Sequence, residues 1–93
     1  MISDNFNLKS KFEQAYYFEM QGKTEEAIHH YAGIGKDEPR HREALLSMAA
    51  LYSKLNKTID SLFCFEKAVS IEPDYLSIFN IGNIYYKLAD YKK

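Results

Sequence analysis

The side chains with the most capacity for chemistry are three histidines, one cysteine and several neighbouring carboxylates. A metal ion in a protein needs three or four ligands that converge on one point. His29 and His30 are adjacent, so on a helix their side chains point about 100° apart, and His41 belongs to a different element. Helix capping and a solvated face account for Glu25 and Glu26. We therefore predict no metal site.

The sequence offers no better support for a covalent or phosphate-binding site. Cys64 has no histidine at helical spacing beside it and is expected to pack as a small apolar residue. The stretch Gly33-Ile-Gly35-Lys36 lacks the third glycine of a phosphate loop, follows a predicted helix instead of a strand, and does not end in Gly-Lys-Ser/Thr. No nucleophile, base and oxyanion donor occur together. The sequence predicts a protein that is not an enzyme and needs no cofactor.

Charge and hydropathy exclude two classes of partner. Twelve Lys and Arg against 13 Asp and Glu give a net charge of −1, so no global field attracts nucleic acid or an anionic membrane. No stretch approaches the roughly 20 apolar residues of a membrane span, and the first 20 residues carry no signal peptide. A single cysteine cannot form an internal disulfide. We predict a cytoplasmic protein that binds neither nucleic acid nor membrane.

The elements that position these residues are helical hairpins. Residues 42–52 and 57–68 are apolar at helical spacing, with a polar break between them and Pro73 after them. The surrounding sequence repeats this unit. Pairs 34 residues apart are Pro39 and Pro73, Tyr31 and Phe65, Ala27 and Ser61, and Ile34 and Ala68. A fixed period of this length indicates an array of structural repeats.

Local signals predict where each helix begins and ends. Gly22 ends the first helix, Thr24 caps the second, and Gly33 and Gly35 fray the end of the second. Asp90 is expected to cap a sixth helix. The first, third, fourth and fifth helices are predicted at about 8–21, 40–54, 58–70 and 74–88.

These residues resemble the tetratricopeptide repeat, whose 34-residue pattern has large, small and aromatic residues at fixed positions. In the second unit those positions hold Leu45, Met48, Ala49, Tyr52, Ser61, Phe65 and Pro73, and in the third Ile81, Gly82 and Tyr85 follow the same pattern. The resemblance implies an all-α fold, an α-α superhelix of helix-turn-helix repeats. It implies one domain over 1–93 with about two and a half repeats and five helices: about 8–41, 42–74 and a partial repeat at 75–93.

The resemblance also implies a function. Tetratricopeptide repeats form protein–protein interaction modules of the adaptor, scaffold or co-chaperone type, with a concave groove that binds a peptide or a partner helix. The groove positions carried over are Phe12, Tyr16, Met20, Leu46, Ala50, Lys54, Phe79, Asn80, Asn83, Tyr86 and Lys87. Aromatic anchors with polar neighbours are typical of interface hot spots. The amides of Asn80 and Asn83 suit hydrogen bonds to a ligand's backbone.

One subclass of the family does not fit this chain. Members that bind chaperone tails hold the C-terminal carboxylate of the tail with Lys, Asn and Arg. The corresponding positions here are Phe12, Tyr16, Ser47, Leu76 and Asn80. We predict no affinity for such acidic C-terminal tails.

The last predicted helix carries apolar residues where a partner is missing. Ile78, Ile81, Tyr85 and Leu88 would leave an apolar surface that monomers rarely tolerate. The chain is therefore expected to be a fragment of a longer array or to form a homodimer through this face. Two alternative functions stay open: a regulatory or targeting segment of a larger enzyme, and a self-association module.

Overall fold

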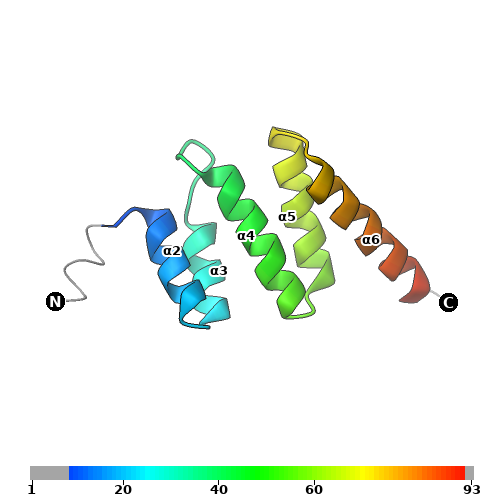
Figure 1. The fold of residues 1–93 in the computed structure, drawn as a ribbon, viewed down its shortest axis with the longest axis horizontal. Coiled ribbons are helices and arrows are strands. Elements are labelled where there is room, and N and C mark those ends of the chain that lie inside the picture. The colour runs from blue at the N-terminus through cyan, green and yellow to red at the C-terminus, as the bar shows by residue number, and fades with distance from the viewer. Residues whose placement is uncertain (1–8, 92–93) are drawn as a thin grey trace.

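The computed structural model describes residues 9–91, and this part of the chain is built from helices with no strand. The five helices are α2 (Lys11–Met20), α3 (Thr24–Ala32), α4 (His41–Lys54), α5 (Thr58–Ile71) and α6 (Tyr75–Tyr91) (Figure 1). The predicted all-α architecture with five helices is confirmed over this range.

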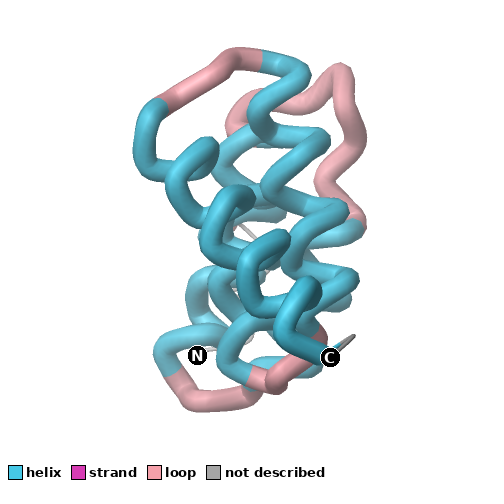
Figure 2. The backbone as a smooth tube through the Cα atoms, turned by 90° about the vertical axis from the view of Figure 1, so that its right-hand side faces the viewer, coloured by secondary structure: helices cyan, strands magenta, loops and turns pink. Residues whose placement is uncertain are grey.

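The helices follow one another in a row (Figure 1), and each packs mainly on the helix before it and the helix after it. α2 and α3 form one hairpin, and α4 and α5 form the next. Viewed from the α6 end, the helices stand one behind another, with their connections near the upper and lower ends of the helices (Figure 2). This arrangement makes α6 the outermost layer, with α5 on its inner side.

The first helix begins later than predicted because Ser10 caps it. The Ser10 hydroxyl accepts a hydrogen bond from the Glu13 backbone N–H, and the Glu13 carboxylate accepts one from the Ser10 N–H. These reciprocal bonds satisfy two N–H groups that a helix start leaves unpaired. The helix therefore starts at Lys11 and not near Leu8, which lies outside the described residues.

The reversal between α2 and α3 depends on Gly22, as predicted. Its backbone has a φ of +76°, a left-handed conformation that favours glycine. Thr24 does not cap α3 as expected: it is the first helical residue, and the capping position is Lys23, which makes no capping side-chain bond. α3 ends at Ala32, directly before Gly33, in agreement with the predicted weakness of that segment.

The last helix is longer than predicted. Asp74 begins it by accepting a hydrogen bond from the Ser77 N–H across 2.8 Å, and the helix continues to Tyr91. Asp90 lies inside α6 and caps no sixth helix, so that prediction was wrong. The sequence after Leu88 contains neither Gly nor Pro, and nothing local stops the helix there.

Small residues lie at the points of contact between helices. Ala15, Ala27, Ala49, Ser61 and Ala68 are almost completely buried, at 0–1% exposure. Their small side chains let neighbouring helices approach closely, and the larger Tyr31, Ile28 and Ile34 fill the space around them. The buried cluster around Tyr31 is formed by α2, α3, the loop after α3, and α4, and α5 adds further buried small residues at its contact with α4.

Candidate functional site

Two adjoining cavities run along one side of α4, α5 and α6. The first, of about 410 Å³, is lined by Ala50, Ser53, Ser61, Phe65, Asn80, Asn83, Ile84 and Lys87. The second, of about 390 Å³, is lined by Arg42, Leu46, Ala50, Phe65, Asp74, Leu76, Ser77 and Asn80. They share Ala50, Phe65 and Asn80, so they form one trough, which we call the α4–α6 groove.

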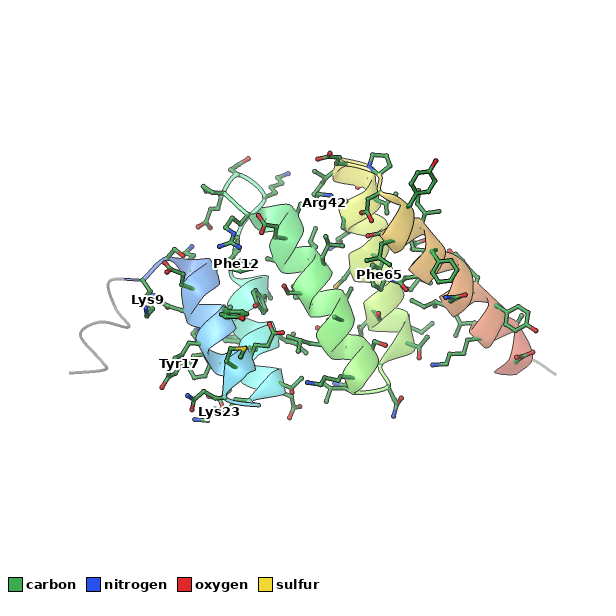
Figure 3. The ribbon with its side chains drawn as sticks, viewed as in Figure 1. Lys9, Phe12, Tyr17, Lys23, Arg42 and Phe65 are labelled. Carbon is green, nitrogen blue, oxygen red and sulfur yellow. The ribbon has the colours of Figure 1, made fainter. Side chains whose placement is uncertain are left out.

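The groove has apolar and polar walls. Ala50 on α4 is small and leaves room above Phe65, which lies on α5 near α6 (Figure 3). Asn80, Asn83 and Lys87 follow one another at intervals of three and four residues, so they share one face of α6. The result is an apolar surface bordered by two amides and a cation, which is the composition of a selective binding site.

Arg42 holds the N-terminal end of this groove together. From the first turn of α4, its Nε donates to the carbonyl oxygens of Ala68, at 3.2 Å, and Glu72, at 3.0 Å, at the end of α5. One terminal nitrogen of its guanidinium also donates to Glu72 O at 2.6 Å and to the Asp74 carboxylate. Figure 3 shows Arg42 at the top of α4 beside these segments. One side chain thereby joins α4, α5 and α6.

The electrostatics of Asp74 follow from its position at the start of α6. The Ser77 backbone N–H and hydroxyl lower the pKa of the Asp74 carboxyl, and the Arg42 guanidinium lowers it further. The carboxylate is therefore charged and paired at neutral pH. Because Arg42 and Asp74 pair with each other, Lys87 is the charged side chain of the groove that is available to a ligand.

Two residues predicted from the second repeat, Leu46 and Ala50, line the groove, and Lys54 is exposed beside them on α4 without lining either cavity. From α6, the predicted residues Asn80, Asn83 and Lys87 line it. Phe79 and Tyr86 are exposed and line neither cavity. The structure thus brings five of the predicted residues together.

The residues predicted from the first repeat lie apart from this groove. Phe12 packs edge-on against the Tyr31 ring, with 5.2 Å between ring centres, and the Arg40 guanidinium lies over the Phe12 ring, 3.7 Å from the ring centre. Tyr16 and Met20 are exposed on α2 and line neither cavity. Phe12 is therefore already engaged within the chain.

The groove residues that sequence reasoning missed include Phe65 and Ile84. The repeat pattern assigns Phe65 to the space between helices, yet it is only half-buried and contributes to the cavity wall. Ile84 lies four residues after Asn80, on the same face of α6. That spacing was the available signal for Ile84.

The residues considered for other chemistry have structural roles. His30 stacks on Phe18, with 4.6 Å between ring centres, and His41 Nδ1 lies 3.0 Å from the Ile34 carbonyl oxygen. Cys64 is buried, and burial raises the pKa of its thiol, which makes it a poor nucleophile. Within residues 9–91, no group of three or more His, Cys, Asp or Glu side chains could hold a metal ion.

The glycine-containing loop after α3 uses its polar groups internally. The Gly35 N–H donates to Glu38 Oε1 at 2.9 Å, and the same oxygen accepts from Lys11 Nζ at 2.9 Å. These bonds lower the pKa of the Glu38 carboxyl. The Gly35 amide, which a phosphate loop would offer to its ligand, is therefore occupied by a carboxylate.

The four residues predicted as a self-association face divide into two pairs. Ile78 and Tyr85 are about half exposed, and the Tyr85 hydroxyl donates to Glu66 Oε2 on α5 at 2.8 Å. Ile81 and Leu88 are half-buried. The exposed surface of α6 therefore includes Ile78 and Tyr85, while Ile81 and Leu88 lie toward its edge.

Comparison with known proteins identifies the central part of the chain. Residues 43–75 match the family described as the tetratricopeptide repeat. The match covers most of α4, all of α5 and the first residue of α6. A comparison with curated proteins gives no match. Over the described residues, no helix combines the length and apolar character needed to cross a membrane.

Proposed function

Because residues 43–75 of this chain match the tetratricopeptide repeat family, we propose that the α4–α6 groove binds an extended segment of a partner protein. Repeats of this family form protein–protein interaction modules. The observation that carries the proposal is the continuity of the two cavities through Ala50, Phe65 and Asn80. Together they make a trough long enough for successive side chains of one ligand.

The chemistry of the groove indicates what such a ligand offers. Phe65 and Ile84 provide an apolar surface for an aliphatic or aromatic side chain. Asn80 and Asn83 each present one carbonyl acceptor and one amide donor, which match the N–H and C=O groups of a peptide backbone. Lys87 favours a carboxylate at that end of the ligand.

We propose a non-catalytic role of the adaptor, scaffold or co-chaperone type for the module. A free, buried cysteine fits the reducing cytoplasm as its compartment. That the groove has no affinity for acidic chaperone tails remains a prediction, based on Phe12 and Leu76 at positions where such binders carry polar or cationic groups. A regulatory repeat segment of a larger enzyme would use the same groove in the same way.

The test begins with selection of ligands from a library of random peptides displayed on phage, with the 93-residue chain as bait. Affinity of the selected peptides is then measured by fluorescence polarisation for wild type and for an Asn80→Ala/Asn83→Ala variant. Loss of two hydrogen bonds of about 1 kcal/mol each predicts roughly 30-fold weaker binding.

The matched control is Ile59→Ala/Phe63→Ala, which truncates two exposed apolar residues of α5 that do not line the groove. It should bind the selected peptides as wild type does. If the asparagine variant keeps full affinity and the α5 variant loses it, the binding surface is the outer face of α5 and the proposal is wrong.

A further inference from the structure

α6 exposes positions that the equivalent helix α4 buries. Leu45 and Ala49 of α4 are 6% and 0% exposed, in the hairpin with α5. Thirty-three residues later, Ile78 is 49% exposed, and a methyl group added at Gly82 would meet no other atom within 4 Å outside its own helix. α6 therefore has a face shaped to receive a helix, and no helix within residues 9–91 packs upon it.

The exposed face is an uncharged stripe that is symmetric about Gly82. It consists of Tyr75, Ile78, Phe79, Gly82, Tyr85, Tyr86 and Ala89, all exposed to solvent, which we call the α6 outer stripe. These positions lie three, four and seven residues on either side of Gly82, so they share one face of the helix. Gly82 also lies near the middle of α6, which spans Tyr75–Tyr91.

We propose that a second copy of this chain covers the α6 outer stripe, with the two α6 helices antiparallel and crossing at Gly82. In that register Gly82 of one copy meets Gly82 of the other. Ile78 lies opposite Tyr86 of the other copy, and Phe79 lies opposite Tyr85. The highly exposed side chain of Tyr75 lies opposite the small Ala89. A two-fold axis through Gly82 produces every one of these pairings twice.

The close contact proposed at Gly82 resembles a helix–helix contact within the chain. Between α4 and α5, the small Ala49 and Ser61 meet and are both almost completely buried. Two facing glycines permit an equally close or closer approach. The larger side chains on either side of Gly82 can then interdigitate.

The available area suffices for a dimer. Tyr75, Phe79, Tyr85 and Tyr86 are 93%, 65%, 51% and 75% exposed. At the roughly 150–250 Å² that an aromatic side chain can bury, these residues with Ile78 offer roughly 600 Å² per copy. A pair then buries roughly 1,200 Å², the lower limit of specific protein interfaces. We expect a dissociation constant in the micromolar range.

Charge supports a second copy as the occupant. No residue of the stripe is charged, so two identical faces meet without like-charge repulsion. Lys87, the cation of α6, lines the groove and lies off the stripe. The dimer therefore leaves the α4–α6 groove open, and its failure would leave the proposed peptide binding untouched.

The test is sedimentation velocity of the 93-residue chain over roughly 1 µM to 1 mM. Wild type should pass from monomer to dimer over this range. Gly82→Glu should remain monomeric, because the new side chain has open space in a single copy but blocks the crossing point. Replacing a helical glycine also favours folding by up to about 1 kcal/mol, so loss of association cannot be attributed to unfolding.

The control variant is Phe63→Glu, which places the same charge on an exposed aromatic position of α5 that is not part of the α6 outer stripe. It should dimerise as wild type does. A wild-type chain that stays monomeric throughout overturns the proposal and leaves the stripe for a helix of another protein. Dimerisation of Gly82→Glu with wild-type affinity overturns it as well.

Cysteine cross-linking tests the antiparallel register. Mixing Ile78→Cys and Tyr86→Cys chains should give a disulfide-linked heterodimer on mild oxidation. Ile78→Cys alone should not cross-link, because its two copies would be eight residues, or about 12 Å, apart along the axis, beyond the reach of a disulfide. Efficient cross-linking of Ile78→Cys alone would overturn the antiparallel arrangement.

Discussion

The hydroxyl of Ser61 on α5 donates a hydrogen bond to the backbone carbonyl oxygen of Ala49 on α4, across 2.8 Å. Both residues are almost completely buried. Their side chains are small enough for the two helix backbones to approach closely, and the buried hydroxyl is satisfied by the carbonyl. We therefore expect the contact between these helices to depend on the size of residue 61 more than on its polarity.

Substitutions at Ser61 should separate these two effects. Ser61→Ala keeps the size and removes one hydrogen bond, so we expect a loss of about 0.5–1.5 kcal/mol in the free energy of unfolding. Ser61→Leu overfills the contact and should cost about 1–3 kcal/mol or more. Urea denaturation followed by circular dichroism measures both. Equal stability of the two variants would show that close packing at this point is unimportant.

Removal of the Arg42 guanidinium should loosen α6. Arg42→Met keeps an apolar stem but loses the bonds to Ala68, Glu72 and Asp74. We expect a loss of about 1–3 kcal/mol, with faster amide hydrogen exchange in α6 than in α4. The control Lys36→Met removes an exposed cation from the loop before α4 and should change neither. Unchanged exchange in α6 of Arg42→Met would contradict this role.

The number of helices and the buried small positions were predictable because they depend on local pattern. Apolar spacing, glycines and prolines recur along the chain, and Ala27, Ala49 and Ser61 occupy equivalent places in that repeat. The Ser10–Glu13 capping box was also readable, as a Ser followed three residues later by Glu. The prediction missed it and began the first helix too early.

The Arg42 network was not predictable in this way, because it joins residues 26 to 32 positions apart. Only the packing of α4 against α5 brings those groups together. The same limit applies to Phe79 and Tyr86, which the repeat pattern assigns to the groove: both are exposed on α6 and line neither cavity. Which face of α6 is directed toward α5 is set by tertiary contacts and not by the sequence of α6 itself.

Stability should decrease in acid because three carboxyl groups gain partners on folding. The Ser10 N–H and hydroxyl lower the pKa of Glu13, the Gly35 N–H and Lys11 lower that of Glu38, and the Ser77 N–H lowers that of Asp74. A lowered folded-state pKa gives stability that is complete above the unfolded-state value, near 4, and is lost as pH falls below it.

This prediction is checked by urea unfolding between about pH 7 and pH 3. A variant carrying Glu13→Gln, Glu38→Gln and Asp74→Asn cannot titrate at these positions, so its stability should vary less with pH over the acid range. Circular dichroism at pH 7 establishes that the variant is folded. An acid loss as large as that of wild type would assign the effect to other groups.

The Tyr31 hydroxyl makes stability sensitive to alkali. It donates a hydrogen bond to Glu19 Oε1 at 2.7 Å, and burial of the phenol, with that bond second, raises the pKa of Tyr31 far above its usual value. The unfolded chain ionises this tyrosine near pH 10 while the folded chain does not. Stability is therefore complete below about pH 10 and falls as pH rises above it.

Tyr31→Phe should lower the free energy of unfolding by about 0.5–1.5 kcal/mol at pH 7, from the lost hydrogen bond. It should also reduce the further loss between about pH 9 and pH 11, because a phenylalanine cannot ionise in the unfolded chain. Tyr52→Phe is the control: burial also raises the pKa of Tyr52, but its phenol is only partly buried, so it should flatten the alkaline loss less. The same flattening in both variants would mean that the Glu19 bond and the complete burial of Tyr31 contribute nothing specific.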